Sequence, residues 1–100
     1  MIRHVVMWKL KESAEGKTKA ENITWIKEHL FALCSVIPEI KKMEIGTDIT
    51  GSDRSMDLML LTEFESVETL NIYAVHPEHV KVATYVRKVA DTRAVLDCEL

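Results

Sequence analysis

The sequence is poor in residues that break regular structure and in residues that build covalent or phosphate-binding sites. It contains only three glycines, two prolines and two cysteines in 100 residues. The scattered glycines form no Gly-rich phosphate loop, and no nucleophile elbow is present. The two cysteines lack the spacing of a metal or redox motif. We therefore expect neither a nucleotide-binding loop nor a bound cofactor.

The chain also lacks a strong positive charge and a long apolar run. Its net charge is -3, and no stretch approaches the length of a membrane span. Because phosphate binding needs a concentrated basic face, we expect no nucleic-acid partner and no membrane partner. No apolar leader with a cleavage site precedes the first strand. We expect a cytoplasmic protein in which Cys34 and Cys98 are reduced, small core residues.

What the chain has is the composition of one globular domain over residues 1–100. Apolar residues make up 47% of it and charged residues 29%. Four segments alternate in apolar and polar character, which predicts strands. These segments are residues 2–10, 40–49, 56–64 and 93–99.

Helical spacing of apolar residues fills the intervals between these strands. The first helix is predicted to begin at Thr18, which has capping-box spacing to Glu21, and to end before Pro38. Ser66 is a suitable N-cap for a second helix, and Pro77 suits the first position of a third. The first helix should bury a stripe that includes Ile23, Ile26, Leu30, Leu33, Cys34 and Ile37.

The element order βαββαβ predicts an α+β, ferredoxin-like fold with a four-stranded antiparallel sheet and its helices on one face. The other face of that sheet would carry Val5, Met7, Met59 and Leu61. A solvated face should be polar, so we expect two copies to pack these faces together as a homodimeric α/β barrel. The alternative is a monomer with scattered exposed methionines.

The residues most suited to chemistry gather between the second and third helices. They are Tyr73, His76 and His79, and His4 on the first strand can approach them if its face packs under the helices. A histidine beside a tyrosine in an apolar pocket suits proton transfer. Alternatively, His76 turns the chain, His79 is an exposed helix-start residue and Tyr73 is core. We expect no metal site, because two histidines three residues apart lack a clear third ligand.

The segment 64–70, followed by Tyr73 and the run His76-Pro77-Glu78-His79, resembles the stress-responsive dimeric α/β-barrel (Dabb) family. The opening strand and the closing residues 95–97 are similar to that family too. The resemblance implies the fold and the dimer described above. One plant member is a polyketide cyclase that closes an aromatic ring by aldol chemistry.

By that resemblance, His79 would be a general base, Tyr73 would orient it or bind a carbonyl, and His4 would line the same pocket. The chain departs from the cyclase where Leu58 and Leu30 replace a pocket histidine and a pocket tyrosine, and where Trp8 replaces a smaller residue. These changes argue against the same substrate. The full set of expected ligand-pocket residues is Val6, Trp8, Leu30, Leu58 and His76.

Three functions are compatible with this sequence. The first is binding of a small hydrophobic or carbonyl-bearing molecule, with proton transfer by His79. The second is a structural stress or assembly role, in which the cluster only stabilises the helix junction and Trp25 and Phe31 make assembly contacts. The third is a cofactor-free monooxygenase of the related dimeric-barrel type, which rests on shared architecture alone.

Overall fold

The computed structural model describes residues 1–100 and has the predicted βαββαβ order. One small hairpin is added before the first helix, and the second helical segment is broken into two helices at Pro77. The strands of the main sheet are β1 (Ile2–Leu10), β4 (Lys42–Thr47), β5 (Leu58–Phe64) and β6 (Ala90–Glu99). The remaining elements are β2 (Ser13–Ala14), β3 (Lys17–Thr18), α1 (Lys19–Ala32), the 3₁₀ turn η1 (Leu33–Ser35), α2 (Val67–Val75) and α3 (Pro77–Val89).

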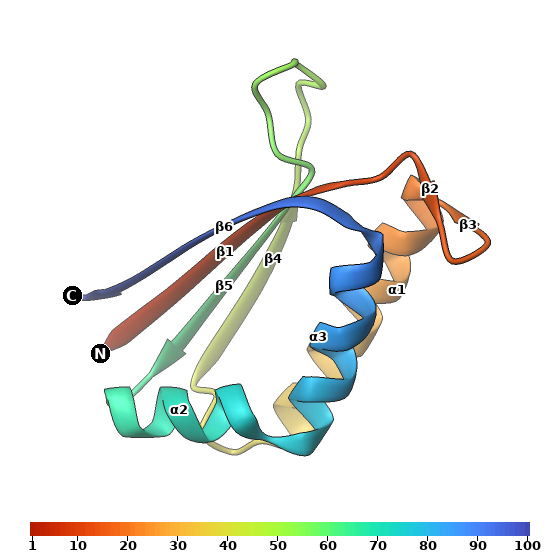
Figure 1. Ribbon diagram of the computed structural model, residues 1–100. Coiled ribbons are helices and arrows are strands. Elements are labelled where there is room, and N and C mark those ends of the chain that lie inside the picture. Colours follow the sequence, from red (N-terminus) through yellow and green to blue (C-terminus); the bar gives the residue numbers. More distant parts are fainter.

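The main sheet is antiparallel throughout, in the order β4-β5-β1-β6. Figure 1 shows all three helices on the same side of this sheet, with α1 and α3 side by side. The two termini lie next to each other, and the Leu100 N–H donates to the Met1 carbonyl. No helix has both the length and the apolar character that a membrane crossing requires.

Alternation along β1 decides which of its side chains face the helices. Ile2, Val6, Trp8 and Leu10 are all buried on this face. Their neighbours on β5 continue it, because Val6 is paired with Leu60. Burying such apolar side chains contributes roughly 1.5–3 kcal/mol each to folding. The helices complete the core with residues that include Ile26, Leu30, Leu33, Tyr73, Val82, Val86 and Val89.

The helix starts are fixed by side chains, as predicted. The Thr18 hydroxyl accepts the Glu21 N–H while the Glu21 carboxylate accepts the Thr18 N–H, which completes a capping box. The Ser66 hydroxyl accepts the Thr69 N–H at the start of α2. At the α2–α3 junction, His76 has extended backbone angles and Nδ1 of its ring accepts the Glu78 N–H. His76 is therefore the cap of α3.

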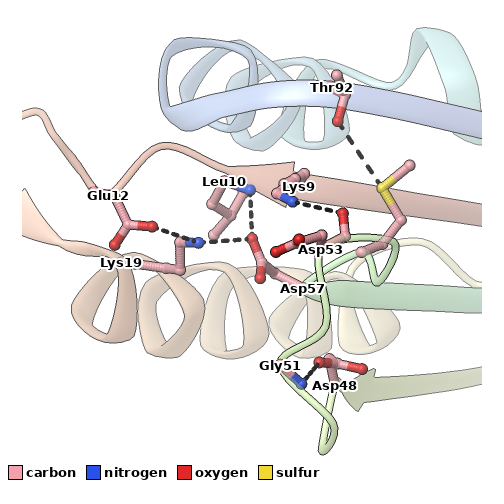
Figure 2. Close-up of polar contacts among 10 residues, drawn as sticks. Lys9, Leu10, Glu12, Lys19, Asp48, Gly51, Asp53, Asp57 and Thr92 are labelled. Atoms are coloured by element: carbon pink, nitrogen blue, oxygen red, sulfur yellow. Dashed lines mark hydrogen bonds and ion pairs between the residues drawn. The ribbon is translucent and has the colours of Figure 1, made fainter.

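The start of β5 is tied to β1 and α1 by a polar network, shown in Figure 2. The Asp57 carboxylate accepts the Leu10 N–H at 2.8 Å and pairs with the Lys19 ammonium at 3.1 Å. Lys19 also reaches Glu12 at 3.2 Å. This network closes the base of the loop 48–57, which projects beyond the sheet in Figure 1.

Several predicted boundaries and positions were wrong. The predicted strand 40–49 forms only over Lys42–Thr47, since its pairing with β5 ends at Thr47. Ile49 consequently lies in the loop and is 96% exposed. The predicted strand 56–64 begins at Leu58, and the strand predicted to start at 93 begins at Ala90.

The prediction that Cys34 belongs to the core was also wrong. The α-helix ends at Ala32 and continues as a 3₁₀ turn with a tighter period. The stripe therefore loses its phase there, and Cys34 is exposed. Cys98 is half-buried and lies opposite Arg3, on the sheet face away from the helices.

That far face of the sheet is covered by no element of the chain (Figure 1). Strand register places three cross-strand apolar neighbours at its centre: Val5, Leu61 and Leu96. Met7 is 39% exposed there and Leu96 is 62% exposed. The face is edged by an ion pair between Arg3 and Glu63 at 2.6 Å. The sheet thus has one face in the core and one apolar face free.

Candidate functional site

A cavity of about 610 Å³ lies between α3 and the helix-facing side of β1 and β6. Its volume falls within the range of small-molecule sites. Twelve of its 18 lining residues are hydrophobic, Tyr73 among them. The residues that carry polar side chains are His4, Tyr73, His79, Arg87, Asp91, Thr92 and Arg93.

Tyr73 is the most buried polar side chain of the cavity wall, with 1% exposure. Its ring packs between Phe64, at a centroid distance of 5.0 Å, and His79, at 4.2 Å. Its hydroxyl has no hydrogen-bond partner in the structure. Burial raises the pKa of Tyr73, and the charge of Cys34 acts in the same direction. Tyr73 is therefore a neutral phenol with an unused donor at neutral pH.

His79 lies in the first turn of α3 and is held there by the end of α2. Nδ1 of its ring lies 3.1 Å from the Ala74 carbonyl oxygen. A carbonyl oxygen only accepts, so Nδ1 carries the proton and Nε2 keeps its lone pair in the neutral ring. Burial lowers the pKa of His79, outweighing the hydrogen bond to Ala74, and the charges of His4, Arg87 and Arg93 lower it further. His79 is thus a neutral base at pH 7.

His4 completes the group from the sheet side. Its Nδ1 contacts the Asp97 carboxylate on the neighbouring strand, where the two residues are direct cross-strand partners. The rings of His4 and Tyr73 lie edge to face at 6.2 Å. Because a carboxylate only accepts, Nδ1 of His4 is the donor to Asp97.

The structure brings together most of the residues predicted from the sequence. His4, Val6, Trp8, Leu30, Tyr73 and His79 all line the one cavity. His76 and Leu58, which were also predicted to line the pocket, do not line this cavity. The His76 ring is occupied as the cap of α3. Leu58, 2% exposed, is packed in the core beside Trp8, its partner on β1, and Trp8 faces the cavity instead.

Sequence reasoning missed the charged rim of the cavity, formed by Arg87, Asp91 and Arg93. Arg87 lies one helical position after the buried Val86, and Arg93 is the cross-strand partner of Trp8. The helical period of the third helix was a signal in the sequence that could have identified Arg87. The position of Arg93 becomes clear only from the strand register. No group of three or more His, Cys, Asp or Glu side chains has an arrangement that could hold a metal ion.

The family assignment follows from comparison with known proteins. The family model described as the stress-responsive A/B barrel domain (Dabb) matches residues 2–100. This chain belongs to the Dabb family. The Dabb chain is also 31% identical over 81 residues to olivetolic acid cyclase from Cannabis sativa, a match covering 79% of the chain and 76% of that protein.

Solved structures share the fold of this Dabb chain. A dimeric protein of unknown function and ferredoxin-like fold from Bacteroides fragilis is 26% identical, with a TM-score of 0.81, over 99% of this chain and 95% of that one. A hydroxynitrile lyase from Passiflora edulis is 21% identical, with a TM-score of 0.84, over 99% and 92% of the two chains. The second likeness is one of fold alone.

Proposed function

We propose that this Dabb protein binds a small, apolar, carbonyl-bearing molecule in the cavity and transfers a proton at the carbon next to that carbonyl. The observation that carries the proposal is Tyr73, a residue that lines the apolar cavity and whose buried hydroxyl has no hydrogen-bond partner. An unpaired buried donor costs roughly 1–3 kcal/mol. A ligand carbonyl that accepts from Tyr73 would recover that cost on binding.

The neighbouring imidazole supplies the second half of the chemistry. With Nδ1 bound to Ala74, His79 has Nε2 as a proton acceptor, next to the Tyr73 ring. In the proposed step, Nε2 takes a proton from the α-carbon of the ligand, and the C–H electron pair forms the enolate. The Tyr73 hydroxyl donates to the enolate oxygen, where the charge develops. Return of the proton from Nε2 to the carbon would complete an exchange. Alternatively, attack of the enolate carbon on a second carbonyl would form a C–C bond and an alkoxide, and the alkoxide would take the proton back from Nε2 of His79.

The cyclase similarity supports this class of reaction. Olivetolic acid cyclase is the relative at 31% identity, and a cyclase of carbonyl compounds needs a base beside a carbonyl-binding donor. Leu30 stands where the resemblance to the cyclase implies a pocket tyrosine, so that polar group is absent here and we propose a different ligand. Neither a monooxygenase activity nor a purely structural role has a comparable observation in its favour.

We further propose that the protein works as a homodimer through the free sheet face. The apolar centre around Val5, Leu61 and Leu96 has the character of a buried interface. The Bacteroides fragilis relative of the same fold is dimeric. A second copy related by two-fold symmetry would cover this face with the same residues.

The binding half of the proposal can be tested with 2-decanone as the probe. The chain has two tryptophans, and Trp25 stacks on Tyr85 away from the cavity. In a Trp25→Phe background, the fluorescence of Trp8 reports on the cavity alone. We expect saturable binding of 2-decanone that weakens about three- to tenfold in Tyr73→Phe, since one hydrogen bond is worth about 0.5–1.5 kcal/mol. Equal affinity in the two proteins would contradict the role of Tyr73.

A further inference from the structure

The rim of the cavity holds two arginines that nothing in the chain neutralises. Arg87 at the end of α3 and Arg93 near the start of β6 both line the cavity and are exposed. Neither forms an ion pair or a side-chain hydrogen bond. No other arginine or lysine lines the cavity. By contrast, the adjacent Lys88 is 4.0 Å from Glu15 and does not line the cavity. Two unpaired guanidinium groups at a pocket mouth are suited to an anion.

These arginines lie at the opposite end of the cavity from the proton-transfer pair. Arg87 is eight residues after His79 on α3, a rise of about 12 Å. On the sheet, His4 and Trp8 are four residues apart, about 13 Å, and Arg93 is the partner of Trp8. The wall between the two ends is apolar and is formed by Val6, Leu30, Leu60, Val82 and Val86.

We propose that the cavity selects elongated amphiphiles that carry a carbonyl at one end and a carboxylate at the other, held by Arg87 and Arg93. This inference rests on the proposed function, which it narrows to a ligand class. The carbonyl meets Tyr73 and His79, the apolar middle fills the central wall, and the carboxylate lies between the two guanidinium groups.

The electrostatics of the rim favour an anion over a cation. Asp91 also lines the cavity, so the rim carries two positive charges against one negative charge. Asp91 has no ion pair with either arginine. Burial is the main cause that lowers the pKa of His79, and the charges of both arginines act in the same direction. This positive end belongs to a chain whose net charge is -3.

The test compares three probes that share a ten-carbon chain: 9-oxodecanoate, its methyl ester and 2-decanone. They share the ketone and chain length, and only the first carries a charge. We expect 9-oxodecanoate to bind about five- to twentyfold more tightly than the two neutral probes at low salt. This preference should shrink at 0.5 M NaCl, because salt screens exposed charges.

Charge variants in the Trp25→Phe background assign the preference to the rim. Arg87→Gln with Arg93→Gln should bring 9-oxodecanoate to the affinity that its methyl ester has for the same double variant. Lys88→Gln, which removes the same charge outside the cavity, should keep the full preference. Asp91→Asn should increase it.

The outcomes separate this inference from the proposed function. If 2-decanone binds but the carboxylate adds no affinity, or if the double variant keeps the preference, the ligand class is wrong and the proposed function stands. If no probe binds the wild-type cavity, both proposals are overturned together.

Discussion

Replacing Tyr73 with Phe removes one oxygen atom from the most buried polar side chain of the cavity. In most folded proteins this change breaks a hydrogen bond and costs roughly 1 kcal/mol of stability. Here the hydroxyl has no partner and its residue is 1% exposed, so there is no hydrogen bond to lose. The variant no longer carries the desolvation cost of the unpaired hydroxyl, which is about 1–3 kcal/mol. The net gain in stability is smaller, because small shifts in the wild-type protein already relieve part of that cost.

We therefore expect Tyr73→Phe to stabilise the protein by about 1 kcal/mol and to weaken ketone binding at the same time. For a domain of this size, 1 kcal/mol raises the midpoint of thermal unfolding by about 4–8 °C. Differential scanning calorimetry and urea titration at equal protein concentration measure the change, since a dimer's midpoint depends on concentration. Tyr85→Phe is the matched control.

Tyr85 differs from Tyr73 in one respect that matters here. Its hydroxyl donates to the Asn22 side chain at 2.7 Å, and Asn22 is fully buried. Tyr85→Phe should therefore cost about 1–2 kcal/mol, because it leaves the Asn22 oxygen unpaired. If Tyr73→Phe is destabilised as much as Tyr85→Phe, the Tyr73 hydroxyl has a partner in the free protein and the reasoning fails.

Three further predictions concern His79, the dimer and the first helix. Because the folded pKa of His79 is lowered, its contribution to stability is complete above about pH 6.5 and is lost as the pH falls toward the folded pKa. Urea titrations should thus show wild type losing stability relative to His79→Gln between pH 7.5 and 5, and parallel profiles would refute this. Leu61→Lys should give a monomer in analytical ultracentrifugation, whereas Ile72→Lys on exposed α2 should remain dimeric. Thr18→Ala should lose about 1 kcal/mol in urea titration by breaking the capping box, and an unchanged midpoint would contradict that role.

Much of the fold could be predicted from periodicity because both faces of the sheet leave a clear pattern. Alternation along residues 2–10 placed His4, Val6 and Trp8 on one face, and the structure confirms this. The capping residues Thr18 and Ser66 were equally readable, since a cap depends only on residues within one turn. Strand alternation and helix capping were therefore predictable, because each depends on residues that are close in the sequence.

The differences at the cavity come from tertiary packing. Leu58 and Leu60 lie on the same strand face, and only the position of α3 decides that Leu60 lines the cavity. Arg93 reads as an ordinary surface charge until its register opposite Trp8 is known. The unpaired Tyr73 hydroxyl could not be foreseen at all, because it depends on every side chain around it.

The most direct test of the account is the exchange of the α-protons of 2-decanone for deuterium in D₂O, followed by proton NMR. We predict that the wild-type protein accelerates this exchange, that Tyr73→Phe slows it, and that His79→Gln abolishes it while 2-decanone still binds. The rate should rise with pH through the lowered pKa of His79 and then level off. Exchange at the uncatalysed rate with the cavity saturated, or undiminished exchange in His79→Gln, would contradict proton transfer by the Tyr73–His79 pair.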